Sequence, residues 1–159
     1  KNSLKFITEM NQLARESNVS LVLENLFPEI DNKVSIACTL EEINDLVIGL
    51  PKDVGLLLDL GHLNISSNLL NFDRRIFLDK FLDRYGDRLL EVHISENNGL
   101  VDEHKGLNYD SWQIDAIKQI KSHSSTVNLK QRIFCIEARK ETIQKLVQTI
   151  EIVKKILET

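Results

Sequence analysis

Short apolar runs alternate with amphipathic segments along the chain. The apolar runs lie at about 20–26, 54–59, 89–95 and 131–137, and runs of this length are typical of buried parallel strands. Apolar residues recur at helical spacing over about 3–16, 39–50, 72–85, 110–122 and 140–158. One helix is therefore followed by four strand–helix units, and this order predicts an α/β fold with a parallel sheet.

Local signals mark the ends of several predicted helices. Thr39 with Glu42 three residues later is a capping box, and Pro51 ends the helix that it begins. Gly86 ends the helix over 72–85, and His123 lies at the end of the next one as a surface or C-capping residue. The predicted inward face of the last helix consists of Ile143, Leu146, Val147, Ile150, Val153 and Leu157.

Acidic residues and histidines stand where the predicted strands end. Glu24, Asp59 and His93 follow one another at about 35 residues, and Glu137 comes later because a polar loop over 96–108 intervenes. Right-handed crossovers place the carboxyl ends of parallel strands on one rim, which is where such folds carry their chemistry. Three further residues follow these strands and are expected on the same rim: His62, Asp102 and His104.

Crowded carboxylates on this rim predict a divalent cation. Glu24, Asp59, Asp102 and Glu137 would repel one another at low dielectric, and without a cation some would stay protonated. Mixed imidazole and carboxylate ligands suit Zn²⁺, Mn²⁺, Fe²⁺ or Co²⁺ better than Ca²⁺ or Mg²⁺. The sequence therefore predicts a site for one or more of these metals.

Each candidate residue also has a structural interpretation when it is taken alone. Asp59 could cap the next helix while His62 lies on the surface, and His93 could be a hydrogen-bonded core histidine. Glu24 and Glu137 could be solvated strand ends, with Arg139 as an ion-pair partner of Glu137. Lys105 and Arg139 are candidates for contact with a substrate phosphate or sugar oxygen, against a default of solvated surface side chains.

Composition narrows the class of protein. At 159 residues the chain is expected to form a single domain over 1–159. A net charge of −4 argues against a general attraction to nucleic acid or anionic membranes, and no apolar run is long enough to span a bilayer. Cys38 and Cys135 have no CxxC partner, so both are interpreted as reduced, buried cysteines of a cytoplasmic protein.

The rim residues lie in segments that resemble one known superfamily over about residues 20–140. The matching segments are Leu-Glu24-Asn, Leu-Leu-Leu-Asp59-Leu-Gly-His62, Val-His93-Ile-Ser-Glu-Asn-Asn-Gly, Asp102-Glu-His104 and Ile-Glu137. They resemble the C-terminal half of the xylose isomerase-like TIM barrels. This group includes sugar and sugar-phosphate isomerases and epimerases, and the endonuclease IV-type apurinic-site nucleases (AP endonuclease family 2).

The resemblance implies a fold and a ligand set. The fold is the C-terminal half of a (βα)8 barrel. The shared metal ligands of the epimerase-like members correspond to Glu24, Asp59, His93 and Glu137. His62, Asp102 and His104 correspond to positions that hold further metals in the nuclease-like members.

The chain departs from the family pattern in two ways. The loop over 105–109 keeps only one glycine where family members often have Gly-x-Gly. The first half of the barrel, which supplies two more histidine ligands in nuclease-like members, has no counterpart here. Four strands cannot close a barrel and would leave two open edges. We therefore expect a fragment, or a chain that pairs with a missing N-terminal half or with a second copy.

Three functions remain open at this point. The first is a metal-dependent isomerase or epimerase of a sugar or sugar phosphate, in which Glu24 and Glu137 transfer a proton and His62 binds a substrate oxygen. The acidic net charge favours it over the second, hydrolysis of phosphodiesters at abasic sites by a zinc cluster. The third is a half-barrel that keeps ligand residues and serves as an inactive scaffold or binding module.

Overall fold

Four parallel strands form one sheet in the computed structural model, which describes residues 2–29, 35–123 and 132–159. The strands are β1 (Val22–Glu24), β2 (Gly55–Asp59), β3 (Leu89–Ile94) and β4 (Ile133–Ile136), and they lie side by side in chain order. The helices are α1 (Asn2–Glu16), α2 (Leu40–Gly49), α3 (Leu60–Leu69), α4 (Arg74–Tyr85), α5 (Trp112–Ser122) and α6 (Ile143–Glu158), with a 3₁₀ turn η1 (Gly86–Arg88) before β3. The predicted α/β fold is confirmed.

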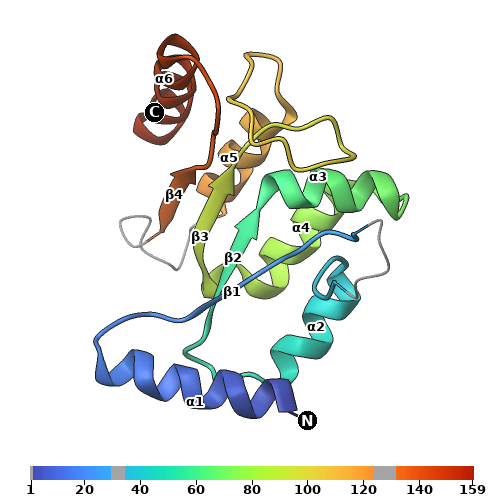
Figure 1. The fold of residues 1–159 in the computed structure, drawn as a ribbon, viewed down its shortest axis with the longest axis vertical. Helices are drawn as coiled ribbons and strands as arrows, with labels where there is room; N and C mark the ends of the chain where they lie inside the picture. Colours follow the sequence, from blue (N-terminus) through green and yellow to red (C-terminus); the bar gives the residue numbers. More distant parts are fainter. Residues whose placement is uncertain (1, 30–34, 124–131) are drawn as a thin grey trace.

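The strand arrows all point the same way in Figure 1, toward α3 and the long loop that follows β3. The register sets Asp59 of β2 beside His93 of β3, and His93 beside Cys135 of β4. On the other side of β2, Glu24 of β1 is the partner of Leu57. The carboxyl ends of the strands therefore form a common rim, as the βα spacing predicts.

One face of the sheet packs on helices and contains the core. Val92 and Ile94 of β3 are fully buried on this face, together with Phe81 of α4 and Ile117 of α5. Because side chains alternate along a strand, Glu91 and His93 point to the opposite face and are partly exposed. The polar side chains of Glu91 and His93 thus lie on the sheet face that the helices do not cover.

Helix α3 is an element that the hydrophobic pattern does not predict. It follows β2 without a loop, and the Asp59 side chain caps it by accepting a hydrogen bond from the His62 backbone N–H at 2.7 Å. Nearly all of its first eight residues are buried, so it lacks a polar face and shows no helical periodicity. Its Asn, Ser and Gly residues are also weak helix formers, which hides it further.

The last helix agrees with the prediction at Val153 and Leu157, which contact the core, and differs from it at Ile143, Val147 and Ile150. Thr149, Ile152, Val153 and Ile156 are buried, whereas Ile143 is 81% exposed, and Val147 and Ile150 are also exposed. The helix is apolar on more than one side, so its sequence does not determine which side faces the sheet. The other boundary signals are confirmed: Thr39 and Glu42 form the capping box, Gly86 follows α4, and His123 is the C-cap of α5.

Within the described residues no further strand pairs with β1 or β4, so both sheet edges are open there, and apolar side chains lie exposed on the elements near them. Phe6 and Leu13 are exposed on α1, the helix that precedes the edge strand β1. At the other edge of the sheet, Ile133 of β4 and Ile143 of α6 are exposed. Strand β1 has three residues and β4 has four, shorter than the predicted runs; residue 131 lies outside the described part. Within the described residues, no helix has the length and apolar content to cross a membrane.

Candidate metal centre

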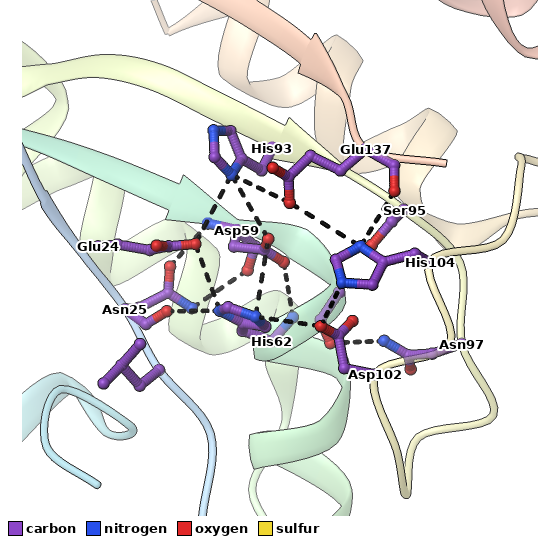
Figure 2. Close-up of polar contacts among 12 residues, drawn as sticks. Glu24, Asn25, Asp59, His62, His93, Ser95, Asn97, Asp102, His104 and Glu137 are labelled. Atoms are coloured by element: carbon purple, nitrogen blue, oxygen red, sulfur yellow. Dashed lines mark hydrogen bonds and ion pairs between the residues drawn. The ribbon is translucent and has the colours of Figure 1, made fainter. Parts of the chain in front are cut away.

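Seven predicted residues come together at the carboxyl ends of the strands (Figure 2). Glu24 ends β1, Asp59 ends β2, His93 lies in β3 and Glu137 directly follows β4. His62 projects from the first turn of α3, and Asp102 and His104 come from the loop after β3. Five separate segments, far apart in the sequence, therefore build one site.

His93 is at the centre of the first set, which we call the four-residue cluster: Glu24, Asp59, His93 and Glu137. Its Nδ1 atom lies 3.6 Å from Glu24 Oε1, 3.7 Å from Asp59 Oδ2 and 3.4 Å from Glu137 Oε2. Asp59 Oδ2 and His93 Nδ1 are buried, and neither has a hydrogen-bond partner among the described residues. Buried polar atoms without partners are rare, and two that lie 3.7 Å apart fit a cation that both would bind.

Asp59 uses its two carboxylate oxygens differently. Oδ1 caps α3 through the His62 N–H, so the sequence-based interpretation of Asp59 as a helix cap is correct. Oδ2 points into the four-residue cluster at the same time. Asn25 holds this residue in place: its Oδ1 accepts from the Asp59 N–H at 2.7 Å, and its Nδ2 donates to the Asp59 carbonyl at 3.1 Å.

A second set, the three-residue cluster, consists of His62, Asp102 and His104. Asp102 Oδ2 lies 2.7 Å from His104 Nε2 and 3.7 Å from His62 Nε2. The two clusters are neighbours, because His62 Nε2 is also 3.9 Å from Asp59 Oδ2. His104 has a left-handed backbone with φ of 52°, a strained conformation that tends to occur at functional sites.

Each histidine is held by one ring nitrogen and presents the other to carboxylates. His62 Nδ1 lies 2.8 Å from the Asn25 carbonyl, and His104 Nδ1 lies 3.0 Å from the Glu137 carbonyl. A carbonyl oxygen only accepts, so both Nδ1 atoms carry the proton and donate. This is how proteins orient metal-ligating imidazoles, with one nitrogen anchored and the other aimed at the ion.

Burial perturbs the acids of the four-residue cluster. Burial raises the pKa of Asp59, and the nearby Asp102 adds to the effect against the opposing imidazoles. Burial also raises the pKa of Glu24, with Asp59 and Glu137 contributing. These shifts have the sign expected for carboxylates that are packed together with too little positive charge.

The donor set fits a divalent transition metal. The four-residue cluster offers three carboxylates and one imidazole, and the ligand atoms of Glu24, Asp59 and His93 lie within 4.8 Å of one another. Imidazole with carboxylate oxygen suits Zn²⁺, Mn²⁺, Fe²⁺ or Co²⁺. Glu91, His93 and Cys135 form another group with ligand atoms this close.

Two predicted substrate residues lie apart from this constellation. Lys105 Nζ makes an exposed ion pair with Glu103 at 2.5 Å, and the Arg139 side chain is exposed. Arg139 contributes its backbone, donating its N–H to the His104 carbonyl at 2.7 Å. Their contact with a substrate therefore stays a prediction.

Sequence reasoning missed Asn25 and Glu91, and it placed Cys135 only as a buried thiol. Asn25 directly follows Glu24 at the end of β1. A side-chain amide at this position can hydrogen-bond to the backbone of the neighbouring strand, and this is the signal that could have identified it. Glu91 stands two positions before His93, so the period of a strand puts both on one face. Cys38 and Cys135 are both free, as predicted, although Cys135 is only partly buried.

Comparisons with known proteins place the chain in a structural context. No family model matches the sequence. The uncharacterised protein MJ1614 of Methanocaldococcus jannaschii is 27% identical over 154 residues, which cover 90% of this chain and 54% of that protein. The uncharacterised protein MJ1311 of the same organism is 28% identical over 104 residues, covering 65% of this chain and 32% of that protein.

A solved structure supports the fold. Endonuclease IV from Thermus thermophilus, a TIM barrel, matches with a TM-score of 0.53 and 18% identity over 96% of this chain and 56% of its own. The chain therefore spans about half the length of MJ1614 and of endonuclease IV. At this identity the likeness shows the fold alone: four consecutive strand–helix units with the arrangement of half a TIM barrel.

Proposed function

We propose that the protein is a divalent-metal-dependent isomerase or epimerase of the xylose isomerase-like superfamily, acting on a sugar or sugar phosphate. The observation that carries the proposal is the pair of unpartnered buried atoms, Asp59 Oδ2 and His93 Nδ1, flanked by two glutamates from opposite edges of the sheet. The half-barrel likeness to endonuclease IV supports the superfamily. The four-residue cluster would hold the cation.

The glutamates would perform the proton transfer. A bound divalent cation would supply Lewis acidity, polarising a substrate carbonyl so that the adjacent C–H becomes acidic. Glu24 and Glu137 approach the same point from β1 and from the end of β4, so one can remove the proton and the other return it. Return to the neighbouring carbon gives an isomer, and return to the opposite face of the same carbon gives an epimer.

His62 would orient the substrate. Its Nδ1 is held by the Asn25 carbonyl, so in the neutral ring its Nε2 accepts a hydrogen bond from a substrate hydroxyl. Phe27 packs against the His62 ring with centroids 4.9 Å apart, which restricts the ring's movement. These contacts support a fixed imidazole beside the reacting carbon.

The three-residue cluster favours a second candidate, phosphodiester hydrolysis by a multi-metal site. Two anchored imidazoles aim Nε2 at Asp102, a donor set that suits Zn²⁺. Two adjacent cations can stabilise the attacking and leaving oxygens of a phosphodiester. We rank this second because the three-residue cluster has one carboxylate for two imidazoles, whereas the four-residue cluster has three carboxylates for one imidazole.

Completion of the barrel is part of the proposal. Both sheet edges are open and exposed apolar residues lie near them, so four further strand–helix units, or a second copy of the chain, would cover these surfaces. The two free cysteines support a reducing compartment such as the cytoplasm. A chain that binds no metal and no sugar would instead be the inactive scaffold.

Proton exchange tests the leading candidate directly. The protein is incubated in D₂O with Mn²⁺ and a panel of aldoses, ketoses and their phosphates, and incorporation of deuterium beside the carbonyl is followed by NMR. We expect exchange with the wild-type protein and with the exposed-site control Glu9→Gln, and none with Glu137→Gln. Retained exchange in Glu137→Gln contradicts the assignment. Cleavage of an abasic-site duplex, with two or more zinc ions per chain, would support the hydrolase instead.

A further inference from the structure

A carboxylate on β3 anchors the ring nitrogen of His93 that points away from the four-residue cluster. Glu91 and His93 lie on the same face of the strand, and Glu91 Oε1 is 3.2 Å from His93 Nε2. His62 and His104 are anchored instead by backbone carbonyls. In β3 the backbone is engaged in strand pairing on both sides, so a side chain has to take this role for His93.

The contact determines which nitrogen of His93 carries the proton. An ionised carboxylate only accepts, so Nε2 must donate to Glu91, and in a neutral ring Nδ1 is then left with a bare lone pair. Nδ1 is the buried atom that has no hydrogen-bond partner among the described residues and faces three carboxylates. A bare Nδ1 is the form that binds a metal ion.

Without Glu91 the opposite tautomer would be favoured. Three carboxylate oxygens at 3.4–3.7 Å would attract a proton to Nδ1, and a metal ion would have to displace it. Glu91 competes for that proton at the far side of the ring.

We propose that Glu91 is a positioning residue that holds His93 in the tautomer and orientation in which Nδ1 binds the cation. This inference rests on the cation site of the proposed function, and it adds a residue that touches neither the cation nor the substrate. Such carboxylate–histidine–metal arrangements raise metal affinity, and loss of the outer carboxylate typically weakens binding by 10–100-fold.

Cys135 provides the competing explanation. It is the strand partner of His93, and its sulfur, a Glu91 oxygen and a His93 nitrogen all lie within 4.8 Å, so the three could hold an ion themselves. The 3.2 Å contact between Glu91 Oε1 and His93 Nε2 already engages these two groups with each other, which favours the hydrogen-bonding role of Glu91.

The tautomer of His93 can be read in the metal-free protein. Long-range proton–nitrogen NMR spectra of ¹⁵N-labelled protein at roughly pH 8, above the usual imidazole pKa, distinguish Nε2–H from Nδ1–H. The His93 signals are assigned by their loss in His93→Gln. We expect Nε2–H in the wild-type protein and in Glu91→Gln, whose amide oxygen still accepts, and a shift toward Nδ1–H in Glu91→Ala.

Metal affinity provides the second readout. In Mn²⁺ titrations, Glu91→Ala should bind about 10–100-fold more weakly than wild type, Glu91→Gln should recover most of the loss, and Cys135→Ser should be unchanged. An unchanged tautomer in Glu91→Ala overturns the proposal, and so does an equal loss of affinity in Cys135→Ser. Failure of the cation site itself appears differently, as an absence of metal binding in the wild-type protein, while the tautomer result still tests Glu91.

Discussion

Replacing Asp59 with asparagine separates the two roles of this buried side chain. Asparagine keeps an oxygen in place of Oδ1, so the His62 N–H that begins α3 retains its acceptor. The substitution removes the negative charge that points into the four-residue cluster at Oδ2. The cation site is therefore lost while the helix cap is preserved.

The structure sets the size of the effect. Carboxylate oxygens of Glu24 and Asp59 lie within 4.8 Å of each other, and at an effective dielectric constant of about 20 two full charges at that distance repel by about 3.5 kcal/mol. Partial protonation reduces this, because burial raises the pKa of both groups. Without metal and near neutral pH, we expect Asp59→Asn to be more stable than wild type by up to about 3.5 kcal/mol.

Metal should stabilise the wild-type protein and not the variant, so the difference in stability between the two should shrink. A cation at 100 times its dissociation constant stabilises the wild-type protein by about 2.7 kcal/mol, which corresponds to about 5–11 °C in Tm for a chain of this size. Asp59→Asn should show no comparable shift. The assay is thermal and urea unfolding followed by circular dichroism, with chelator and with Mn²⁺ or Zn²⁺, using Glu9→Gln as an exposed control. A variant that is less stable without metal, yet keeps the wild-type shift with metal, would refute this reasoning.

Three further predictions concern the pH dependence of stability, the packing around Gly61 and the hydrogen bonds from Asn25 to Asp59. The raised pKa values of Glu24 and Asp59 mean that the folded metal-free protein binds protons more tightly than the unfolded chain, so its stability should fall as pH rises from about 4 through those values. Urea midpoints across this range should show a weaker fall in Asp59→Asn, and an equal fall would count against the shift of Asp59. Gly61→Ala should lower the free energy of unfolding by about 1–3 kcal/mol, because its Cβ would lie 2.7 Å from Ser95 Oγ and 3.1 Å from Asp59 Oδ1. A gain in stability would show that the neighbouring side chains move aside without cost. Asn25→Ala should cost about 1–3 kcal/mol by the same measurement, since it removes the side-chain hydrogen bonds to the buried N–H and C=O of Asp59, and unchanged stability would contradict that role.

The sequence predicts the sheet and the rim well, for a physical reason. Buried parallel strands are short and almost wholly apolar, so a polar residue that ends such a run is conspicuous, as Asp59 is after Leu56–Leu58. The repeat of strand and helix then places Glu24 and His93 on the same rim without knowledge of any contact. These residues could be found before the structure was known.

Other features depend on tertiary packing and leave a weaker trace. Helix α3 is buried on nearly all sides, so its sequence lacks the periodicity that reveals surface helices. Helix α6 is apolar on several sides, and only its contacts in the structure show that Ile152 faces inward while Ile143 does not. The Glu91–His93 contact is local in sequence, but its meaning requires the position of the other ring nitrogen.

Counting bound metal tests the central claim most directly. Purified protein is dialysed to equilibrium against Mn²⁺, Co²⁺ or Zn²⁺, and the ion content is measured by elemental analysis beside Asp59→Asn, Glu137→Gln and the control Glu9→Gln. We predict one tightly held ion per chain in the wild type and the control, and its loss in both cluster variants, because their carboxylates face the same His93 nitrogen. Wild-type protein without a bound ion, or undiminished binding in both cluster variants, would contradict the account.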